Sequence, residues 1–126
     1  MNGFHARCLR RIAGVAPSFI SRVSNETVLN KFDALPLSAT LLKRQLCYFG
    51  KIARLPPTSS LRGLVFEPDS LRLVVVGKRK RGRPRLEWGR ELLKEAQKLC
   101  GSEVALNTRI SDPVSWKTFV VARTVP

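Results

Sequence analysis

The stretch SATLLKRQLCYFGKIAR, residues 38–54, carries the clearest helical pattern in the chain. Ser38 has the chemistry of a helix N-cap, and the proline pair Pro56-Pro57 ends the pattern. Spacings of three and four residues place the inward-facing positions on one side of this helix; they are Leu42, Gln45, Leu46, Phe49, Ile52 and Ala53. The stretch predicts an amphipathic helix at the centre of a small, mainly α fold.

Two shorter helices are predicted before it, which makes residues 1–56 a helical unit. The first is predicted to have Asn2 as its N-cap and to end near Gly14 and Pro17. Its apolar side is predicted to be Phe4, Cys8, Ile12 and Val15, with Arg7, Arg10 and Arg11 on the opposite side. The second begins after Ser24 as N-cap and ends before Pro36, because a residue ahead of proline disfavours helical angles. Its inward residues are Val28, Leu29 and Phe32.

Residues 57–85 are predicted to form a flexible basic connector. Two short apolar runs, residues 64–66 and 71–76, flank the sequence Glu67-Pro68-Asp69-Ser70. That sequence has good turn chemistry, with proline at its second position. Two interpretations remain open for this region: a weak β-hairpin, or a loop that becomes ordered only on DNA.

One or two helices are predicted in residues 86–126. The first has an apolar side at helical spacing and ends at Gly101, a residue suited to the left-handed conformation of a C-cap. That side consists of Trp88, Leu92, Ala96 and Leu99. A last short helix is predicted to begin with Asp112 as N-cap and Pro113 at the first helical position. Trp88 and Trp116 are most simply interpreted as core anchors.

The chain is strongly basic. It has 126 residues, with 23 Lys and Arg against 9 acidic residues, a formal net charge of +14 and a pI near 11.1. This balance favours a polyanion, nucleic acid above all, over acidic metabolites as the partner. The length leaves no room for a multidomain enzyme, and the apolar run Leu73–Val76 is far too short to cross a bilayer. We therefore expect a nucleic-acid partner and no membrane partner.

The basic residues are concentrated in one octet, Lys78-Arg79-Lys80-Arg81-Gly82-Arg83-Pro84-Arg85. Glycine has no side chain, so the backbone can approach the floor of a narrow minor groove while Arg81 and Arg83 extend along it. The narrow groove of A·T-rich duplex favours arginine, and the outer basic residues can pair with phosphates. The octet is similar to the AT-hook of high-mobility-group chromatin proteins. A nuclear import signal, which is compatible with DNA contact, and an inert basic linker are the alternatives.

A second, weaker candidate surface is the basic side of the central helix. Its members are Lys43, Arg44, Lys51 and Arg54. They could steer a nucleic-acid backbone to the domain through salt-dependent contacts that do not depend on sequence. The alternative is the ordinary solvated side of an amphipathic helix.

Catalysis is poorly supported by the residue pattern. Two-metal phosphoryl chemistry needs clustered carboxylates, yet the chain has no adjacent aspartates, and Glu87, Glu91 and Glu95 fit a solvated helix face. His5 with the three cysteines could supply zinc ligands, but zinc modules usually bring their ligands in close pairs. We expect no enzymatic activity and no cofactor.

Five segments, in order, carry a resemblance. They are Phe4–Gly14, Val23–Leu29, Leu42–Pro56, Gly77–Trp88 and Asp112–Trp116. They resemble the C-terminal region of reverse transcriptases from non-LTR, LINE-type retrotransposons. Residues 7–12 match an Arg-Cys-Leu-Arg-Arg-Ile helix common in that family, and residues 81–88 match its Arg-Gly-Arg-Pro segment followed by tryptophan. The chain departs from the family at Tyr48, Phe49 and Lys51, where family members usually have tryptophan, leucine and histidine, and at Gly89-Arg90, where an aspartate is usual.

The resemblance implies a non-catalytic tail that helps a parent enzyme hold template RNA or target DNA. In family members the endonuclease and polymerase domains lie upstream of this region. The implied partners are DNA, including the A·T-rich minor groove, or RNA, and the parent polymerase domains. A relic open reading frame with no selected function is an alternative.

Nuclear localisation is the expectation from the basic octet. The alternative is mitochondrial, because the chain carries Arg7, Arg10, Arg11 and Arg22 but no acidic residue before Glu26. Three widely spaced cysteines fit no small disulfide framework, which favours a reducing compartment.

Overall fold

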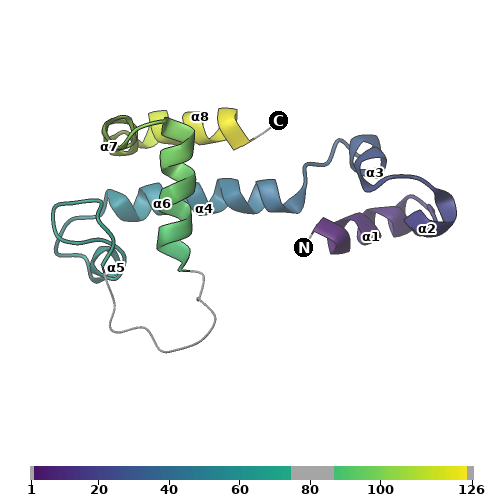
Figure 1. Cartoon of the computed structure of the whole chain (residues 1–126), viewed down its shortest axis with the longest axis horizontal. Coiled ribbons are helices and arrows are strands. Elements are labelled where there is room, and N and C mark those ends of the chain that lie inside the picture. The colour runs from purple at the N-terminus through teal and green to yellow at the C-terminus, as the bar shows by residue number, and fades with distance from the viewer. Residues whose placement is uncertain (1, 75–86, 125–126) are drawn as a thin grey trace. The chain divides into compact units, whose positions relative to one another are not determined.

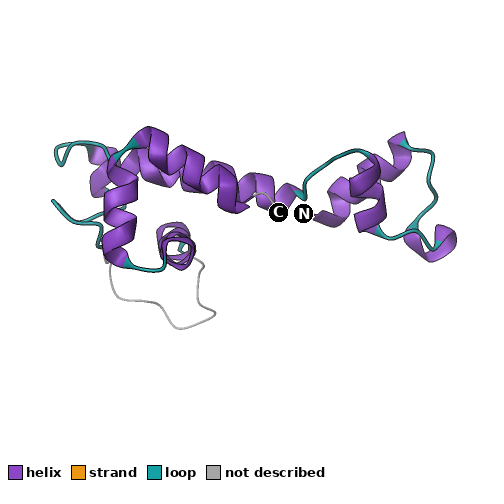
Figure 2. Ribbon diagram, turned by 90° about the horizontal axis from the view of Figure 1, so that it is seen from above, coloured by secondary structure: helices purple, strands orange, loops and turns teal. Residues whose placement is uncertain are grey.

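The structure is a computed structural model, and it describes residues 2–74 and 87–124. The described residues are mainly helical, which confirms the predicted fold class, and the helices are joined by loops (Figures 1 and 2). The helices are α1 (Asn2–Ile12), α2 (Ser18–Ser21), α3 (Asn25–Lys31), α4 (Leu37–Ala53), α5 (Ser60–Gly63), α6 (Trp88–Cys100), α7 (Glu103–Ser111) and α8 (Pro113–Thr124).

The chain divides into two compact units, and the division falls within α4 rather than after it. The N-terminal unit comprises the described residues up to Lys43 together with Thr124, and the C-terminal unit is Arg44–Arg123. Each unit has its own means of cohesion.

Local sequence signals explain the helix ends of the N-terminal unit. Gly14 adopts φ 65°, and the bonds from its N–H to the Arg11 carbonyl and from the Val15 N–H to the Arg10 carbonyl form a Schellman motif after α1. The Ser24 hydroxyl accepts the Thr27 N–H at 3.0 Å, which confirms Ser24 as the N-cap of α3. The short helix α2 was not predicted.

The start of α4 differs from the sequence prediction. The helix begins at Leu37, and the Pro36 carbonyl accepts the N–H groups of Ala39 and Thr40. Ser38 is therefore inside the first turn and is not the N-cap. Its N–H donates to Asn2 Oδ1 at 3.0 Å, and Asn2 Nδ2 donates to the Ser38 hydroxyl at 2.9 Å. Asn2, predicted to cap α1, thus satisfies a free N–H of a helix 36 residues away.

The centre of the N-terminal unit is a buried arginine. The predicted apolar face of α1 is wrong, because Phe4, Cys8 and Ile12 are exposed while Ala6 and Arg10 are buried. The Arg10 guanidinium donates to Asn25 Oδ1, to the Ser21 hydroxyl and to the carbonyls of Ala16 and Val23. Spacing alone could not identify this side, because a fully hydrogen-bonded arginine can replace an apolar residue inside a small unit.

The centre of the C-terminal unit is aromatic. Leu46, Phe49, Ile52 and Ala53 of α4 are buried as predicted. The buried Trp116 indole of α8 donates from Nε1 to the Leu46 carbonyl at 2.9 Å. The ring lies against Gly50, where a Cβ atom would overlap it. Gly50 therefore permits close contact between α4 and α8, which no sequence pattern indicated.

Residues 57–74, part of the predicted connector, contain α5 and a minimal hairpin. The antiparallel contact is a single bridge between Phe66 and Leu73, closed by the turn at 67–70. Buried Arg62 holds this region by donating to the Ala53 carbonyl at the end of α4 and to the Ser70 carbonyl at 3.0 Å. Residues 75–85, the rest of the predicted connector, lie outside the described residues.

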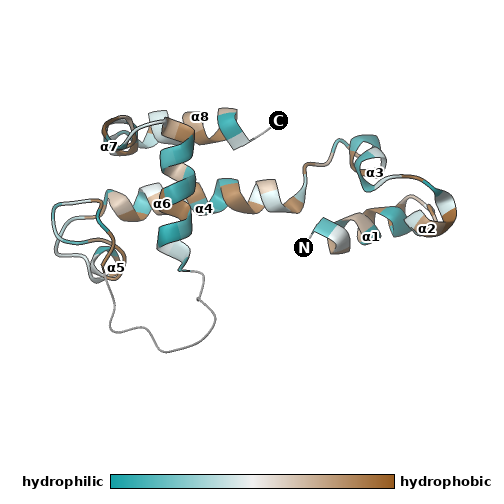
Figure 3. Ribbon diagram, viewed as in Figure 1, coloured by the Kyte–Doolittle hydropathy of each residue, from teal (hydrophilic) through white to brown (hydrophobic). Residues whose placement is uncertain are grey.

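Three helices follow residue 86 in the described part, where the sequence predicted one or two. α6 ends at Gly101 with φ 81°, and Asp112 caps α8 by accepting the N–H groups of Val114 and Ser115, both as expected. The additional helix is α7, whose N-cap Ser102 accepts the Ala105 N–H at 3.2 Å. Hydrophilic residues dominate α6, whereas hydrophobic residues are more frequent in α4 (Figure 3).

Candidate nucleic-acid interface

The strongest predicted site lies outside the described residues. It is the basic octet, Lys78, Arg79, Lys80, Arg81, Gly82, Arg83, Pro84 and Arg85. Its proposed minor-groove contact stays a prediction. In the sequence, Arg85 precedes Trp88, the first residue of α6, by three positions, so the octet comes directly before α6.

The four basic residues predicted on α4 do not have equal access to solvent. Arg44 and Lys51 are exposed, whereas Lys43 and Arg54 are half-buried. Arg54 Nη1 donates to the Ile110 carbonyl at 2.9 Å and so satisfies one of the free carbonyls at the end of α7. Arg44 and Lys51 are the two α4 cations best placed to meet a phosphate.

Between these two cations lies an exposed tyrosine. Arg44, Tyr48 and Lys51 are spaced by four and three residues and therefore share one face of α4. Tyr48 is 47% exposed, and its ring centroid lies 6.0 Å from that of Trp88, which is 37% exposed. The structure thus brings two partly exposed aromatic rings from α4 and α6 beside two exposed cations.

This pairing revises the interpretation of the tryptophans. Trp116, with 1% of its surface exposed, is the core anchor that was predicted. Trp88 is only partly a core residue: it contacts buried Phe49 at a centroid distance of 6.4 Å and presents the rest of its ring to solvent. The sequence signal for the pair was the position of Tyr48 four residues after Arg44 and three before Lys51.

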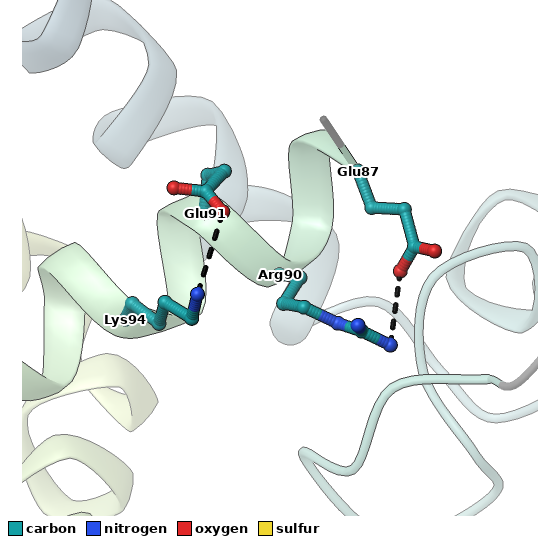
Figure 4. Close-up of polar contacts among 4 residues, drawn as sticks. All are labelled: Glu87, Arg90, Glu91 and Lys94. Atoms are coloured by element: carbon teal, nitrogen blue, oxygen red, sulfur yellow. Dashed lines mark ion pairs between the residues drawn. The ribbon is translucent and has the colours of Figure 1, made fainter. Parts of the chain in front are cut away.

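The first turns of α6 carry balanced charge. Glu87 pairs with Arg90 at 3.1 Å, and Glu91 pairs with Lys94 at 3.5 Å, all with exposed side chains (Figure 4). These pairs reduce the net positive charge on that part of α6. The excess charge next to the aromatic pair therefore comes from α4.

Two further arginines support the fold instead of a binding surface. Arg10 and Arg62 are buried and donate to backbone carbonyls within their own units. A sequence count assigns both of them to the basic surface. Their burial shows that the net charge of the chain overstates what a polyanion can reach.

The cysteines are free. Burial raises the pKa of the Cys100 thiol, and the nearby Arg109 and Arg123 guanidinium groups partly oppose this rise. Among the residues that the structure describes, no group of three or more His, Cys, Asp or Glu side chains could hold a metal ion. Within the same residues, no helix combines the length and the hydropathy that crossing a membrane requires.

Comparisons with known proteins give no match: no protein-family model, no curated protein and no solved structure is similar to this chain.

Proposed function

We propose that this chain binds nucleic acid without catalysing a reaction, in the manner of the C-terminal tail of the LINE-type reverse transcriptases that its sequence resembles. The observation that carries the proposal is the Tyr48–Trp88 pair beside Arg44 and Lys51, reached in the sequence directly from the basic octet. Such a combination suits a nucleic acid, because cations bind the phosphates and aromatic rings stack on the bases.

The two parts of this interface have different roles in the proposal. The octet 78–85 supplies most of the affinity through phosphate contacts, and Arg81 and Arg83 add a preference for A·T-rich duplex if the segment enters the minor groove. The aromatic pair offers a stacking surface to unpaired bases, which a duplex does not present. Nuclear localisation follows as part of the same proposal, since the octet also has the composition of an import signal.

The test is fluorescence anisotropy with A·T-rich duplex, G·C-rich duplex and single-stranded RNA over a salt series. Arg81→Ala/Arg83→Ala should remove any preference for A·T-rich duplex. Arg44→Ala/Lys51→Ala should weaken binding to every ligand and flatten the salt dependence by roughly one unit per lost phosphate contact.

A third variant isolates stacking. Tyr48→Ala should lower the affinity for single-stranded RNA by about 5-fold or more, as expected for the loss of a base–aromatic contact. Tyr48→Phe should retain most of that affinity. Lys98→Ala/Lys117→Ala is the matched control, because it removes two exposed cations from α6 and α8. Equal losses for this control and for Arg44→Ala/Lys51→Ala would contradict an interface at α4.

A further inference from the structure

The N-terminal unit leaves several large apolar side chains in water. Phe4 is 65% exposed and Phe19 75% exposed, and Ile12 and Ile20 are also largely exposed. Single exposed apolar residues are ordinary on protein surfaces, but a cluster of them marks a binding surface. α2, whose sequence is Ser-Phe-Ile-Ser, lies in a hydrophobic part of the ribbon (Figure 3).

Two of these side chains border a groove. The groove encloses about 750 Å³ and is formed by α1, by the segment that leads into α2 and by the start of α3. Its apolar lining includes Phe4, Cys8, Val15 and Phe19. We call it the α1–α2 groove. It lies entirely within the N-terminal unit and shares no residue with the proposed nucleic-acid interface.

The charge of the α1–α2 groove has one sign. Arg7 and Arg11 line it, and neither side chain makes an ion pair or hydrogen bond with the part of the chain that the structure describes. No acidic residue lines the groove, and the sequence has none before Glu26. Arg10, which also reaches the groove, has its guanidinium bound to groups of the unit itself. Arg7 and Arg11 are therefore the cations available to a partner.

We propose that the α1–α2 groove binds an acidic amphipathic segment of a partner protein. Apolar side chains of the segment enter between Phe4 and Phe19, and its Asp or Glu carboxylates pair with Arg7 and Arg11. Recognition of an amphipathic helix by a groove uses this combination of apolar anchors and flanking charge. Phenylalanine and arginine are also among the residues enriched in protein interfaces.

A nucleic-acid strand fits the groove less well. Phe4 and Phe19 offer aromatic rings to bases, but Cys8 and Val15 do not, so a strand held by these rings and by Arg7 and Arg11 would leave the rest of the apolar lining in water. An anionic membrane is disfavoured because Arg7 and Arg11 interrupt the exposed apolar residues of α1, whereas membrane-binding helices present a continuous apolar face. Both remain as outcomes of the test.

The experiment uses the full chain and a short synthetic helical peptide with leucine at i, i+3, i+4 and i+7 and glutamate on both sides of that stripe. Fluorescence anisotropy of the labelled peptide measures binding. Phe4→Ser/Phe19→Ser and Arg7→Glu/Arg11→Glu should each weaken it by about tenfold or more, because they remove an anchor or reverse a charge. A peptide with lysine in place of glutamate should bind the Arg7→Glu/Arg11→Glu variant but not the wild-type chain, because the charges of both partners are then reversed.

The controls match the variants in exposure and charge. Leu64→Ser/Val104→Ser removes two equally exposed apolar residues from the C-terminal unit, and Lys31→Glu/Lys117→Glu makes the same charge change elsewhere. Circular dichroism checks that each variant keeps its helix content. Amide chemical shifts of the wild-type chain, followed during peptide titration, should change mainly in residues 3–19.

Three results would overturn the proposal: no peptide binding, binding that the Phe4→Ser/Phe19→Ser variant leaves unchanged, or shift changes spread outside the groove. Parallel titrations use phosphatidylserine vesicles and oligodeoxythymidylate. If those ligands lose affinity in the Phe4→Ser/Phe19→Ser variant while the peptide does not bind, the groove is a membrane or nucleic-acid site instead. The α4 variants of the nucleic-acid test should leave peptide binding unchanged, so the two proposals can fail separately.

Discussion

The N-terminal unit and the C-terminal unit are held together by opposite means. The former surrounds the Arg10 guanidinium with hydrogen-bond acceptors, and its buried apolar residues, among those that the structure describes, are Ala6 and Val28. The latter packs Trp116, Phe49 and Phe66 into an apolar core, with the Phe49 and Phe66 rings edge to face at 5.2 Å. Apolar packing has no preferred direction, so small shifts of the packed side chains cost little. Hydrogen bonds around one guanidinium instead require the acceptor atoms to lie at particular distances and angles.

This difference explains which side chains each unit leaves at its surface and where each unit places its arginines. A unit centred on an arginine has little apolar area to bury, so its large apolar side chains remain at the surface, as Phe4 and Phe19 do. A unit centred on aromatic residues instead uses arginines at helix ends: half-buried Arg54 and buried Arg62 donate to the carbonyls of Ile110 and Ala53. Arginine is therefore the centre of one unit, whereas in the other it supports an aromatic core.

Removal of the aromatic centre should have the largest effect. Trp116→Ala should destabilise the C-terminal unit by about 3–5 kcal/mol, because it creates a cavity and removes the hydrogen bond to the Leu46 carbonyl. Hydrogen exchange should show lost protection in α6 and α8 but not in α1 and α3. Equal loss of protection in all four helices would show that the two units do not differ in the way described.

Removal of the polar centre should come next. Arg10→Met should destabilise the N-terminal unit by about 2–3 kcal/mol, because the part-buried hydrogen bonds from the Arg10 guanidinium to the carbonyls of Ala16 and Val23 are lost. The measurement is hydrogen exchange in α1 and α3. Arg11→Met, which changes an exposed arginine of the same helix, is the control and should have little effect.

A smaller effect is expected at the contact between α4 and α8. Gly50→Ala should destabilise the C-terminal unit by about 1–2 kcal/mol, because overlap with the Trp116 ring outweighs the gain of about 1 kcal/mol in helix propensity. Urea unfolding followed by tryptophan fluorescence measures the change. Gly63→Ala provides the control, since no atom lies within 4 Å of a Cβ there; stabilisation by both substitutions would refute the close contact.

The cysteines should distinguish the units by reactivity. Cys8 is exposed, whereas the half-buried Cys100 has a raised pKa and so less thiolate at a given pH. Labelling with N-ethylmaleimide should modify Cys8 first, and the Cys100 rate should still rise above pH 9.0, its ordinary pKa. Because the pKa of Cys100 is raised in the folded state, the thiol contributes to the stability of the fold while it is protonated. This contribution is lost as the pH rises through the folded-state pKa. Equal labelling rates at pH 8 would contradict the assignment.

The smallest effect is expected at the surface of α6. Glu91→Gln removes the exposed ion pair with Lys94 and should change stability by less than about 0.5 kcal/mol. Thermal unfolding at low and high salt measures this difference. A change above 1 kcal/mol would mean that this surface contributes to the cohesion of the C-terminal unit.

Much of the fold could be predicted from local sequence. The helix over residues 38–54, the caps Ser24 and Asp112 and the C-cap Gly101 all act within a few residues of the chain, and the structure confirms each of them except the Ser38 cap. The failures have different causes. α7 has weak amphipathic periodicity, and Ser38 is not a cap because α4 begins ahead of it at Leu37, where Asn2, far away in the sequence, accepts the Ser38 N–H.

The candidate sites also divide into those set by neighbouring residues and those set by contacts between distant segments. The basic octet was visible in the sequence because it is a continuous segment, and so was the basic side of α4. The stacking pair was not, because Tyr48 and Trp88 are 40 residues apart in the sequence and meet only when α4 and α6 pack. The α1–α2 groove was missed because Phe4, Cys8 and Val15 were assigned to the apolar side of the first helix and Phe19 was assigned to no element.

By itself, the sequence determined the helical class, most of the helix ends and the excess of positive charge, because capping, periodicity and composition are properties of neighbouring residues. The tertiary structure alone decided which arginines are buried, that Gly50 receives the Trp116 ring and that Trp88 lies beside Tyr48. These outcomes depend on which surfaces meet. Burial is a free energy shared between distant segments, so no single segment specifies it.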